Sequence, residues 1–279
     1  MSEVIEVVGG TPLSGEVGVY GAKNAVLKEM VATLLAPGTH TLENVPGILD
    51  VTLMGDVLRH VGCSVESEGH TLTIDVPEDP NPEAPLDLVR KMRASIVVLG
   101  PLLARVGKAR VAFPGGDDLG ARPIDMHMKA LEKMGAEFDL EHGVLVGTVP
   151  DGRLQGADLS LRFPSVGATD NAVLAAVRAD GTTTVGNPAR EPEIIDHCHQ
   201  LNELGARITG AGTNQIAVEG VERLHPATHH VVPDRLEAGT FAVAGAISGG
   251  EVTVVDCNPE NLRVELSKLE AVGCRIERG

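Results

Sequence analysis

Residues 114–123 read Pro-Gly-Gly-Asp-Asp-Leu-Gly-Ala-Arg-Pro and combine acid–base groups with a cation in one short segment. Three glycines and two prolines in ten residues predict a loop rather than a helix or strand. Asp117 is a candidate proton donor, with Asp118 beside it and the fixed cation of Arg122 shortly after. Such a loop suits a lid over an anionic substrate. An isolated segment of this composition is more often a solvated surface turn, so its meaning depends on the rest of the chain.

Two segments upstream carry further groups that bind anions. Lys23 and Asn24 form a Lys-Asn pair near the N-terminus, and Arg93 lies in a run of basic residues. A lysine ammonium and an asparagine amide can bind phosphate or carboxylate oxygens, although a lone lysine at a helix start is usually solvated. Residues 90–133 hold nine of the 23 Lys and Arg residues but only four Asp and Glu residues. This locally basic segment favours a small anionic ligand, and some of its cations, such as Lys129 and Lys133, are expected to be ordinary helix-surface residues.

These segments occur in a fixed order with three others, which are Phe163–Thr169, Ala189–Glu193 and Pro233–Thr240. Together the six resemble the UDP-N-acetylglucosamine enolpyruvyl transferases (UDP-N-acetylglucosamine 1-carboxyvinyltransferases). That family transfers enolpyruvyl from phosphoenolpyruvate to the 3-hydroxyl of UDP-N-acetylglucosamine and releases phosphate, the first committed step of peptidoglycan synthesis. The resemblance implies a cytoplasmic transferase of cell wall biogenesis, and hence of cell shape, cell division and the cell cycle, that needs no cofactor.

The resemblance also implies roles for particular residues. Asp117 matches the catalytic position, and Lys23 and Asn24 match the residues that bind phosphoenolpyruvate. The residues that match UDP-N-acetylglucosamine contacts are Arg93, Arg122, Pro123, Ile124, Asp125, Met126, Phe163, Pro164, Ser165 and Val166. Phe163 departs from the family, which often has lysine there. Arg190, Glu191 and Glu193 match a family segment without an assigned role, and a structural salt bridge is the expected reading.

Asp117 takes the position where most family members carry cysteine, and some carry aspartate. An unperturbed aspartate has a pKa of about 3.9, so only roughly one in a thousand is protonated at pH 7. Burial under a closed lid, repulsion from Asp118 and a bound anion would all raise that pKa. We therefore expect Asp117 to act as an acid only in the closed, liganded state. Because a carboxylate is a weaker nucleophile than a thiolate, the resemblance also predicts resistance to fosfomycin.

Composition excludes several other classes of protein. The formal charge of −16 and the absence of Trp argue against nucleic-acid binding. The most apolar stretch, Ile96–Ala104, is too short to span a membrane, and the acidic N-terminus does not resemble a secretory signal. Four cysteines without paired spacing indicate reduced thiols. His197-Cys198-His199 is not expected to bind a metal, because residues two apart on a helix do not share a face.

The chain contains a repeat. Four segments share an amphipathic helix end, a glycine and an alternating strand, with the glycines at Gly62, Gly135, Gly205 and Gly273. In three units a turn and strand precede the helix, at Gly38–Val45, Gly181–Asn187 and Gly250–Asp256. Each unit is thus an α/β module of roughly 70 residues, longer than usual solenoid repeats. We expect the modules to pack into a compact domain, with apolar helices such as 26–35 in the middle and sheets outside.

The resemblance implies an α/β (α+β) fold, an inside-out α/β barrel of repeated units as in enolpyruvyl transferases, with two domains around a cleft. Residues 22–231 would form the first domain, and 1–21 with 232–279 part of the second. The family has six units where four fit here, so about a third is expected to be absent at the C-terminus. That third supplies the family's general base and several phosphate-binding arginines.

Three readings follow. In the first, the chain is the enolpyruvyl transferase. In the second, it is a truncated, non-catalytic relative that binds the nucleotide sugar, or an inactive fragment. In the third, it is the sister transferase of the shikimate pathway. The loop at residues 114–123 is not expected in the last of these. Apolar residues of the incomplete second domain are expected to be exposed and to promote association.

Overall fold

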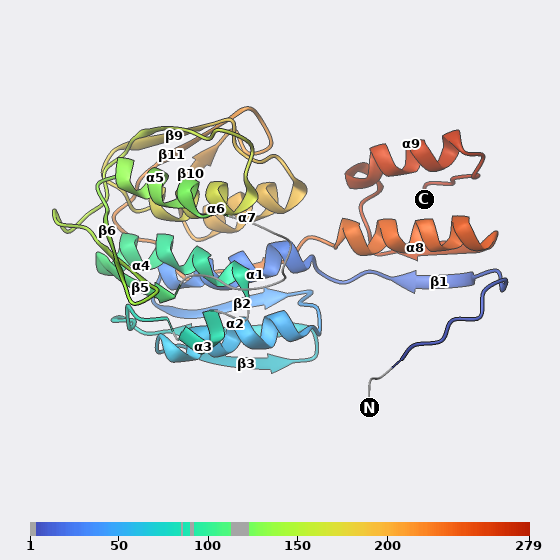
Figure 1. Ribbon diagram of the computed structural model, residues 1–279, viewed down its shortest axis with the longest axis horizontal. Coiled ribbons are helices and arrows are strands. Elements are labelled where there is room, and N and C mark those ends of the chain that lie inside the picture. Colours follow the sequence, from blue (N-terminus) through green and yellow to red (C-terminus); the bar gives the residue numbers. More distant parts are fainter. Residues whose placement is uncertain (1–3, 85, 90–91, 113–122) are drawn as a thin grey trace. The chain divides into compact units, whose positions relative to one another are not determined.

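The computed structural model describes residues 4–84, 86–89, 92–112 and 123–279 (Figure 1). Its contacts divide the chain into a larger unit, Lys23–Val232, and a smaller unit made of Met1–Ala22 and Pro233–Gly279. The assignment of 22–231 and of 1–21 with 232–279 to two family domains stays a prediction. No helix among the described residues is long and apolar enough to cross a membrane.

Three sheets belong to the larger unit. The first has the strand order β12 (Thr228–His230), β2 (Gly38–Glu43), β4 (Thr71–Val76) and β3 (Ser64–Glu68). The second has the order β5 (Lys108–Ala112), β7 (Val144–Thr148) and β6 (Glu137–Glu141). The third has the order β10 (Arg207–Thr209), β11 (Gln215–Glu219), β9 (Thr182–Gly186) and β8 (Asp158–Ser160). Neighbouring strands are antiparallel except for the β12–β2 and β8–β9 pairs. Residues alternate between buried and exposed along most of these strands, so each sheet covers the core with one face.

Helices fill the middle of this unit, as the sequence predicted (Figure 1). Its helices are α1 (Lys23–Ala32), α2 (Leu49–His60), α3 (Leu86–Val89), α4 (Leu99–Val106), α5 (Asp125–Lys133), α6 (Val166–Ala176) and α7 (Pro192–Glu203), with shorter 3₁₀ turns at Thr33–Leu35 and Arg93–Val98. Residues 25–32 of α1 and 168–176 of α6 are buried without a break. A helix buried on all sides is a core helix, and the inside-out α/β architecture is confirmed.

Small residues let these helices approach closely. A Cβ atom on Gly100 of α4 would lie 2.7 Å from Asn171 Oδ1 and 2.8 Å from the Asn171 carbonyl oxygen of α6. No side chain fits in that space, so glycine is required where the two helices cross.

The predicted helix ends are confirmed by the backbone. Gly62, Gly135, Gly205 and Gly273 have φ values of 105°, 95°, 97° and 99°, the conformation that glycine adopts most easily after a helix. The preceding turn-and-strand markers are also confirmed, as β2, β9 and β13 (Glu251–Val255). The fourth alternating strand is wrong, because residues 274–279 form no strand. No neighbouring strand pairs with this segment among the described residues, and a strand depends on such a partner for its backbone hydrogen bonds.

The smaller unit is a two-stranded parallel sheet with two longer helices. Strand β1 (Ser14–Gly18) pairs with β13, and α8 (Arg235–Ser248), a 3₁₀ turn (Pro259–Leu262) and α9 (Arg263–Ala271) complete the unit. Its core cluster of buried residues is small and consists of Val19, Ala238, Leu262 and Leu266. Several of its apolar side chains are exposed, including Ile247 at 85% and Val272 at 78%. The predicted apolar exposure in this part of the chain is therefore present.

Candidate functional site

A hollow of about 160 Å³ lies between α5 and the segment that follows β8. Its walls are Asp125, Met126, Lys129, Ala130 and Lys133 on one side and Leu159, Ser160, Leu161 and Arg162 on the other. One of the segments predicted to contact the nucleotide sugar lines the hollow, through Asp125 and Met126. The second predicted segment begins at Phe163, the residue directly after the lining residue Arg162.

Asp125 organises the charges of this hollow. Its Oδ2 accepts a hydrogen bond from Lys129 Nζ at 3.4 Å and lies 3.8 Å from Arg162 Nη2. Its Oδ1 is buried and has no hydrogen-bond partner among the described residues. Lys133 Nζ donates to the Asp158 carbonyl oxygen at 3.4 Å. Two cations thus lie at the Asp125 carboxylate, and Lys133 adds a third cation to the lining. The lining residues therefore carry a net positive charge, which suits an anion such as a diphosphate.

Phe163 and its neighbours follow Arg162, the last lining residue of the hollow. The Phe163 ring is 47% exposed, and the Arg162 guanidinium lies 5.8 Å from the ring centroid, within cation–π range. Pro164 is exposed and Val166 is half-buried. Ser165 caps α6, since its hydroxyl accepts from the Ala168 N–H at 3.4 Å. The α6 N-terminus, where backbone N–H groups favour anions, therefore begins beside Arg162.

A buried asparagine fixes the elements around this site. Asn171 Oδ1 accepts from the Gly100 N–H at 2.7 Å, and its Nδ2 donates to the Ile96 carbonyl at 3.1 Å and to His127 Nδ1 at 3.0 Å. The first bond sets the orientation of the amide, so His127 Nδ1 must be the acceptor. One side chain on α6 thereby holds α4, α5 and the 3₁₀ turn that begins at Arg93.

Contact with His127 also explains the glycine that directly follows the predicted substrate segment 163–166. A Cβ atom on Gly167 would lie 3.0 Å from His127 Cε1. The absence of a side chain at Gly167 lets the first turn of α6 reach α5. The segments at 123–126 and 163–166 are thus brought together by packing as well as by hydrogen bonds.

Lys23 and Asn24 do not line this hollow. They are exposed at the first two positions of α1, which packs against the 3₁₀ turn containing Arg93. One turn later, Lys28 is buried, donates to the Asn24 carbonyl oxygen and lies 3.9 Å from Asp170 Oδ2. The sequence did not predict this buried lysine, which anchors the start of the helix.

Several predicted residues can be placed only in part. Asp117, Asp118 and Arg122 lie outside the described residues, and only the backbone of Arg93 is described. Pro123 is exposed, and Ile124 is 3% exposed and packs at the start of α5.

The segment 190–193, at the start of α7, has a local role in the backbone. The Arg190 N–H donates to Glu191 Oε2 at 2.8 Å, Glu191 directly precedes α7, and Glu193 is buried in its first turn. Acidic groups at a helix N-terminus are favourable. The salt bridge expected among these three residues stays a prediction.

The His197-Cys198-His199 sequence forms no shared face. His197 and Cys198 are buried while His199 is exposed, and His197 Nδ1 lies 2.9 Å from Asp170 Oδ1. Burial raises the pKa of the Cys198 thiol to about 12, with the Asp170 charge adding to the rise. All four cysteines are unpaired, as the spacing predicted.

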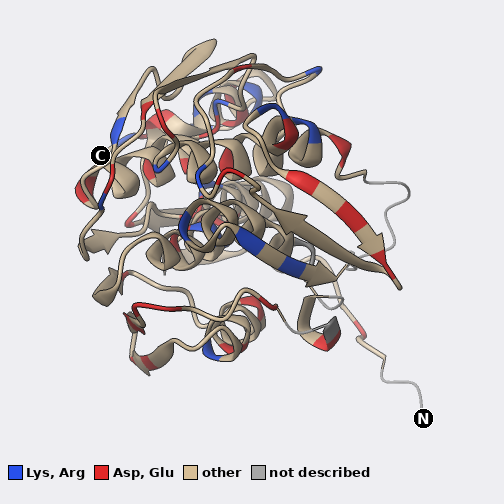
Figure 2. Ribbon diagram, turned by 90° about the vertical axis from the view of Figure 1, so that its left-hand side faces the viewer, with Lys and Arg blue, Asp and Glu red and all other residues tan. Residues whose placement is uncertain are grey.

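The basic segment at 90–133 serves two purposes. The Arg105 guanidinium donates to the Leu34, Pro77 and Glu78 carbonyl oxygens, which is a structural role. Arg110 on β5 donates to Glu141 Oε2 of β6 at 3.0 Å, across the outer strands of their sheet. Figure 2 shows blue basic segments on one strand and red acidic segments on another. Lys129 and Lys133, expected to be simple helix-surface cations, line the hollow. Arg162 lies outside this segment and was not singled out, since nothing but its place before Phe163 marks it.

Comparison with known proteins places this arrangement in a family. Residues 7–279 match the family model described as EPSP synthase (3-phosphoshikimate 1-carboxyvinyltransferase). UDP-N-acetylglucosamine 1-carboxyvinyltransferase of Corynebacterium jeikeium is 52% identical over 277 residues, which are 99% of this chain and 66% of that protein. The enzyme of the same name from Mycobacterium bovis is 48% identical over 276 residues. The chain thus spans about two thirds of the length of these curated relatives.

Solved structures agree on the fold. The enolpyruvyl transferase NikO from Streptomyces tendae superposes with a TM-score of 0.85 at 27% identity, covering 97% of this chain and 65% of that one. An EPSP synthase from Acinetobacter baumannii gives a TM-score of 0.71 at 23% identity, covering 90% of this chain and 57% of that one.

Proposed function

Because the chain belongs to the EPSP synthase family of 1-carboxyvinyl (enolpyruvyl) transferases, we propose that it serves the transfer of enolpyruvyl from phosphoenolpyruvate to the 3-hydroxyl of UDP-N-acetylglucosamine. The observation that carries this proposal is the identity of about half of all positions, over nearly the whole chain, to enzymes named for that reaction. The resulting product would enter peptidoglycan synthesis in the cytoplasm.

The hollow beside α5 supports a place for the nucleotide sugar. Lys129, Lys133 and Arg162 supply the positive charge that a diphosphate requires. The buried Asp125 Oδ1 is an acceptor for an N–H or O–H group of the ligand. Phe163 holds the Arg162 guanidinium at the rim, so Arg162 takes the part of the lysine that the family often has one position later.

The chemistry is assigned by the family's motifs. Lys23 and Asn24 would bind phosphoenolpyruvate at the start of α1. The sugar 3-hydroxyl oxygen adds to the enol carbon and its proton goes to a base, while Asp117 delivers a proton to the methylene carbon, which becomes a methyl group. Phosphate then leaves the tetrahedral adduct as a base removes a proton from that methyl group, which restores the carbon–carbon double bond. In the family, the base for the hydroxyl proton and several arginines lie beyond position 279.

Calorimetric titration with UDP-N-acetylglucosamine tests the hollow. Arg162→Ala should weaken binding about 10-fold or more, since one hydrogen bond to a charged group is lost. Arg207→Ala is the matched control, because Arg207 is similarly exposed in the same unit but pairs with Glu219 on β10 and β11, at the opposite edge of the sheet from β8. Equal affinities in both variants would remove the hollow from the proposal.

Asp117 gives the proposal a second test. In a full-length form, the Asp117 carboxylate should not open the fosfomycin epoxide, whereas Asp117→Cys should stay active and become sensitive. Mass spectrometry after incubation with fosfomycin detects the adduct. A stable adduct on Asp117, or full activity of Asp117→Ala, would contradict the role of this residue.

A further inference from the structure

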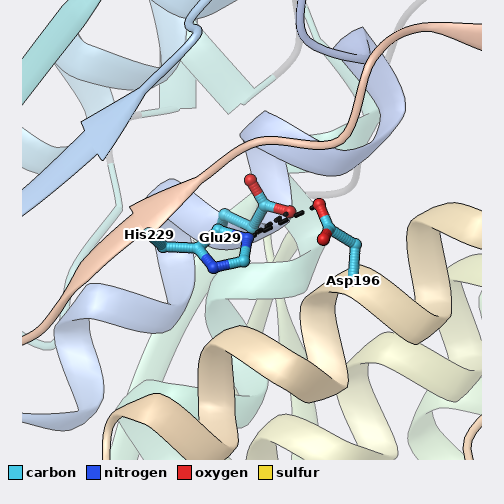
Figure 3. A group of neighbouring side chains, drawn as sticks. All are labelled: Glu29, Asp196 and His229. Atoms are coloured by element: carbon cyan, nitrogen blue, oxygen red, sulfur yellow. Dashed lines mark ion pairs between the residues drawn. The ribbon is translucent and has the colours of Figure 1, made fainter. Parts of the chain in front are cut away.

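Three groups that can bind metals meet inside the larger unit, away from the hollow and from the family motifs. They are Glu29 of α1, Asp196 of α7 and His229 of β12 (Figure 3). His229 Nε2 lies 3.6 Å from Glu29 Oε1 and 3.5 Å from Asp196 Oδ2, and all three ligand atoms lie within 4.8 Å of one another. Glu29 is fully buried, and the His229 residue is 5% exposed.

The polar atoms of this cluster lack hydrogen bonds. Both carboxylate oxygens of Glu29 and the Nε2 atom of His229 are buried without a hydrogen-bond partner among the described residues. Folded proteins rarely leave buried polar atoms in that condition, because desolvation is then uncompensated. The arrangement therefore requires a proton or a cation that all three groups share.

Outer contacts hold the three groups in place. Glu203 Oε2 lies 2.7 Å from His229 Nδ1, so Nδ1 carries a proton and Nε2 is directed at the two carboxylates. The Val232 N–H donates to Asp196 Oδ2 at 2.7 Å, and Gln200 Nε2 donates to the Glu29 carbonyl oxygen at 3.0 Å. A carboxylate behind a ligating imidazole is the usual outer contact of protein zinc sites.

The spacing of the ligand atoms selects the ion. Zinc binds nitrogen and oxygen ligands at about 2.0–2.2 Å, so the ligand atoms of a tetrahedral site lie about 3.3–3.6 Å apart. The two distances from His229 Nε2, 3.5 and 3.6 Å, agree with that geometry. Calcium needs six to eight oxygen ligands at longer distances, and magnesium retains waters and oxygen ligands. An imidazole with two carboxylates is therefore a set for a small transition-metal ion.

We propose that Glu29, Asp196 and His229 form a structural zinc site that joins α1, α7 and β12. The second oxygen of Glu29, or a water, takes the fourth position. The site lies outside the predicted substrate segments, so the zinc proposal can be tested independently of the proposed transfer reaction.

The ion-free protein has a defined alternative state. Burial raises the pKa of Glu29 to about 8. Burial alone would lower the pKa of His229, but interaction with Asp196 and Glu29 outweighs it and raises this pKa to about 11. Without an ion, a charged imidazolium therefore lies between ionised Asp196 and neutral Glu29. Zinc has to replace these protons, so the two states exclude each other and one experiment separates them.

In the experiment, a chelator removes metal from the full chain, and the chelator is then removed. Zn²⁺ is titrated into the protein in a calorimeter, and the bound metal and the thermal midpoint of unfolding are measured. We expect one equivalent of zinc to remain after gel filtration, and a thermal midpoint raised by roughly 5–10 °C when free zinc is about 100 times its dissociation constant. Glu29→Gln keeps the shape of neutral Glu29, so it should fold like the ion-free protein yet lose zinc binding. Glu203→Gln should weaken zinc binding by about 10–100-fold.

His230→Gln is the matched control. His230 is the next residue on β12, its side chain is 66% exposed, and it faces Glu43 at 3.6 Å. Its loss removes one histidine, as His229→Gln does, and should leave zinc affinity unchanged. The proposal is overturned if the wild-type chain retains no stoichiometric zinc, or if Glu29→Gln and His230→Gln bind zinc alike. The first result would assign the cluster to the imidazolium state, and the second would mean an adventitious surface ion.

Discussion

Helices α6 and α8 have similar compositions but different surroundings. Both are rich in Ala, Val and Gly, yet residues 168–176 of α6 are buried without a break, whereas only Ala238 and Gly245 are buried in α8. In the larger unit, α6 packs against α4, α5 and α7, while α8 packs against α9, β13 and a 3₁₀ turn. The comparison shows that an apolar helix sequence does not by itself determine burial. Burial also depends on which elements pack around the helix.

The largest expected effect concerns turnover. If the smaller unit is incomplete as the family pattern implies, the chain alone should release phosphate from phosphoenolpyruvate and UDP-N-acetylglucosamine several orders of magnitude more slowly than a form extended to the length of its relatives. Catalytic groups that act as a unit are strongly non-additive, so loss of the base alone has this consequence. A phosphate-release assay on both forms makes the measurement. Comparable rates in the two forms would contradict the expectation that the longer form adds essential catalytic groups.

Matched truncations measure the difference in packing. Leu174 of α6 is 0% exposed, and Leu174→Ala should lower the free energy of unfolding by about 2–5 kcal/mol, because it leaves a cavity in the core. Ile247 of α8 is 85% exposed, and Ile247→Ala should change it by less than about 0.5 kcal/mol. Urea denaturation of the two variants provides the values. A large loss for Ile247→Ala would mean that this side chain is covered in solution.

Acid should act on the larger unit, which contains all ten histidines. Burial is the main cause that lowers the pKa of His40, so the unfolded chain binds the proton more tightly than the folded one. The stability contributed by neutral His40 is present above pH 6.5 and is lost as pH falls below it, at up to about 1.4 kcal/mol per pH unit.

His40→Gln should therefore flatten the decline in stability between pH 7 and 5, as measured by urea denaturation at several pH values. His60→Gln serves as the control, because His60 is exposed at the last position of α2, and this change should leave the decline in stability unchanged. Identical curves for wild type and His40→Gln would show that other groups cause the acid sensitivity.

The repeat made much of the fold predictable, because local signals specify helix ends. A glycine and an alternating pattern after each of four helices were readable in the chain, and three of the four expected strands are present as β3, β6 and β10. The strand expected at 274–276 was wrong, since alternation alone does not provide a pairing partner. Strand pairing depends on a neighbouring strand elsewhere in the sheet, so a local sequence pattern cannot specify it.

The candidate site was predictable only where a motif marked it. The segments at 123–126 and 163–166 were expected to share a ligand, and packing around Asn171 and Gly167 brings them together. Buried Glu29 was hidden within an apolar helix, because its neighbours come from residues 196 and 229, far away in sequence. Only the presence of a charge within that apolar run signals such a cluster.

Ligand preference tests the central claim most directly. Calorimetric titration of the chain with UDP-N-acetylglucosamine, and separately with shikimate 3-phosphate, compares the acceptor of the proposed reaction with that of the sister transferase. The account predicts saturable binding of UDP-N-acetylglucosamine that Arg162→Ala weakens, and no comparable binding of shikimate 3-phosphate. Binding of shikimate 3-phosphate alone, or binding of UDP-N-acetylglucosamine that Arg162→Ala leaves unchanged, would contradict it.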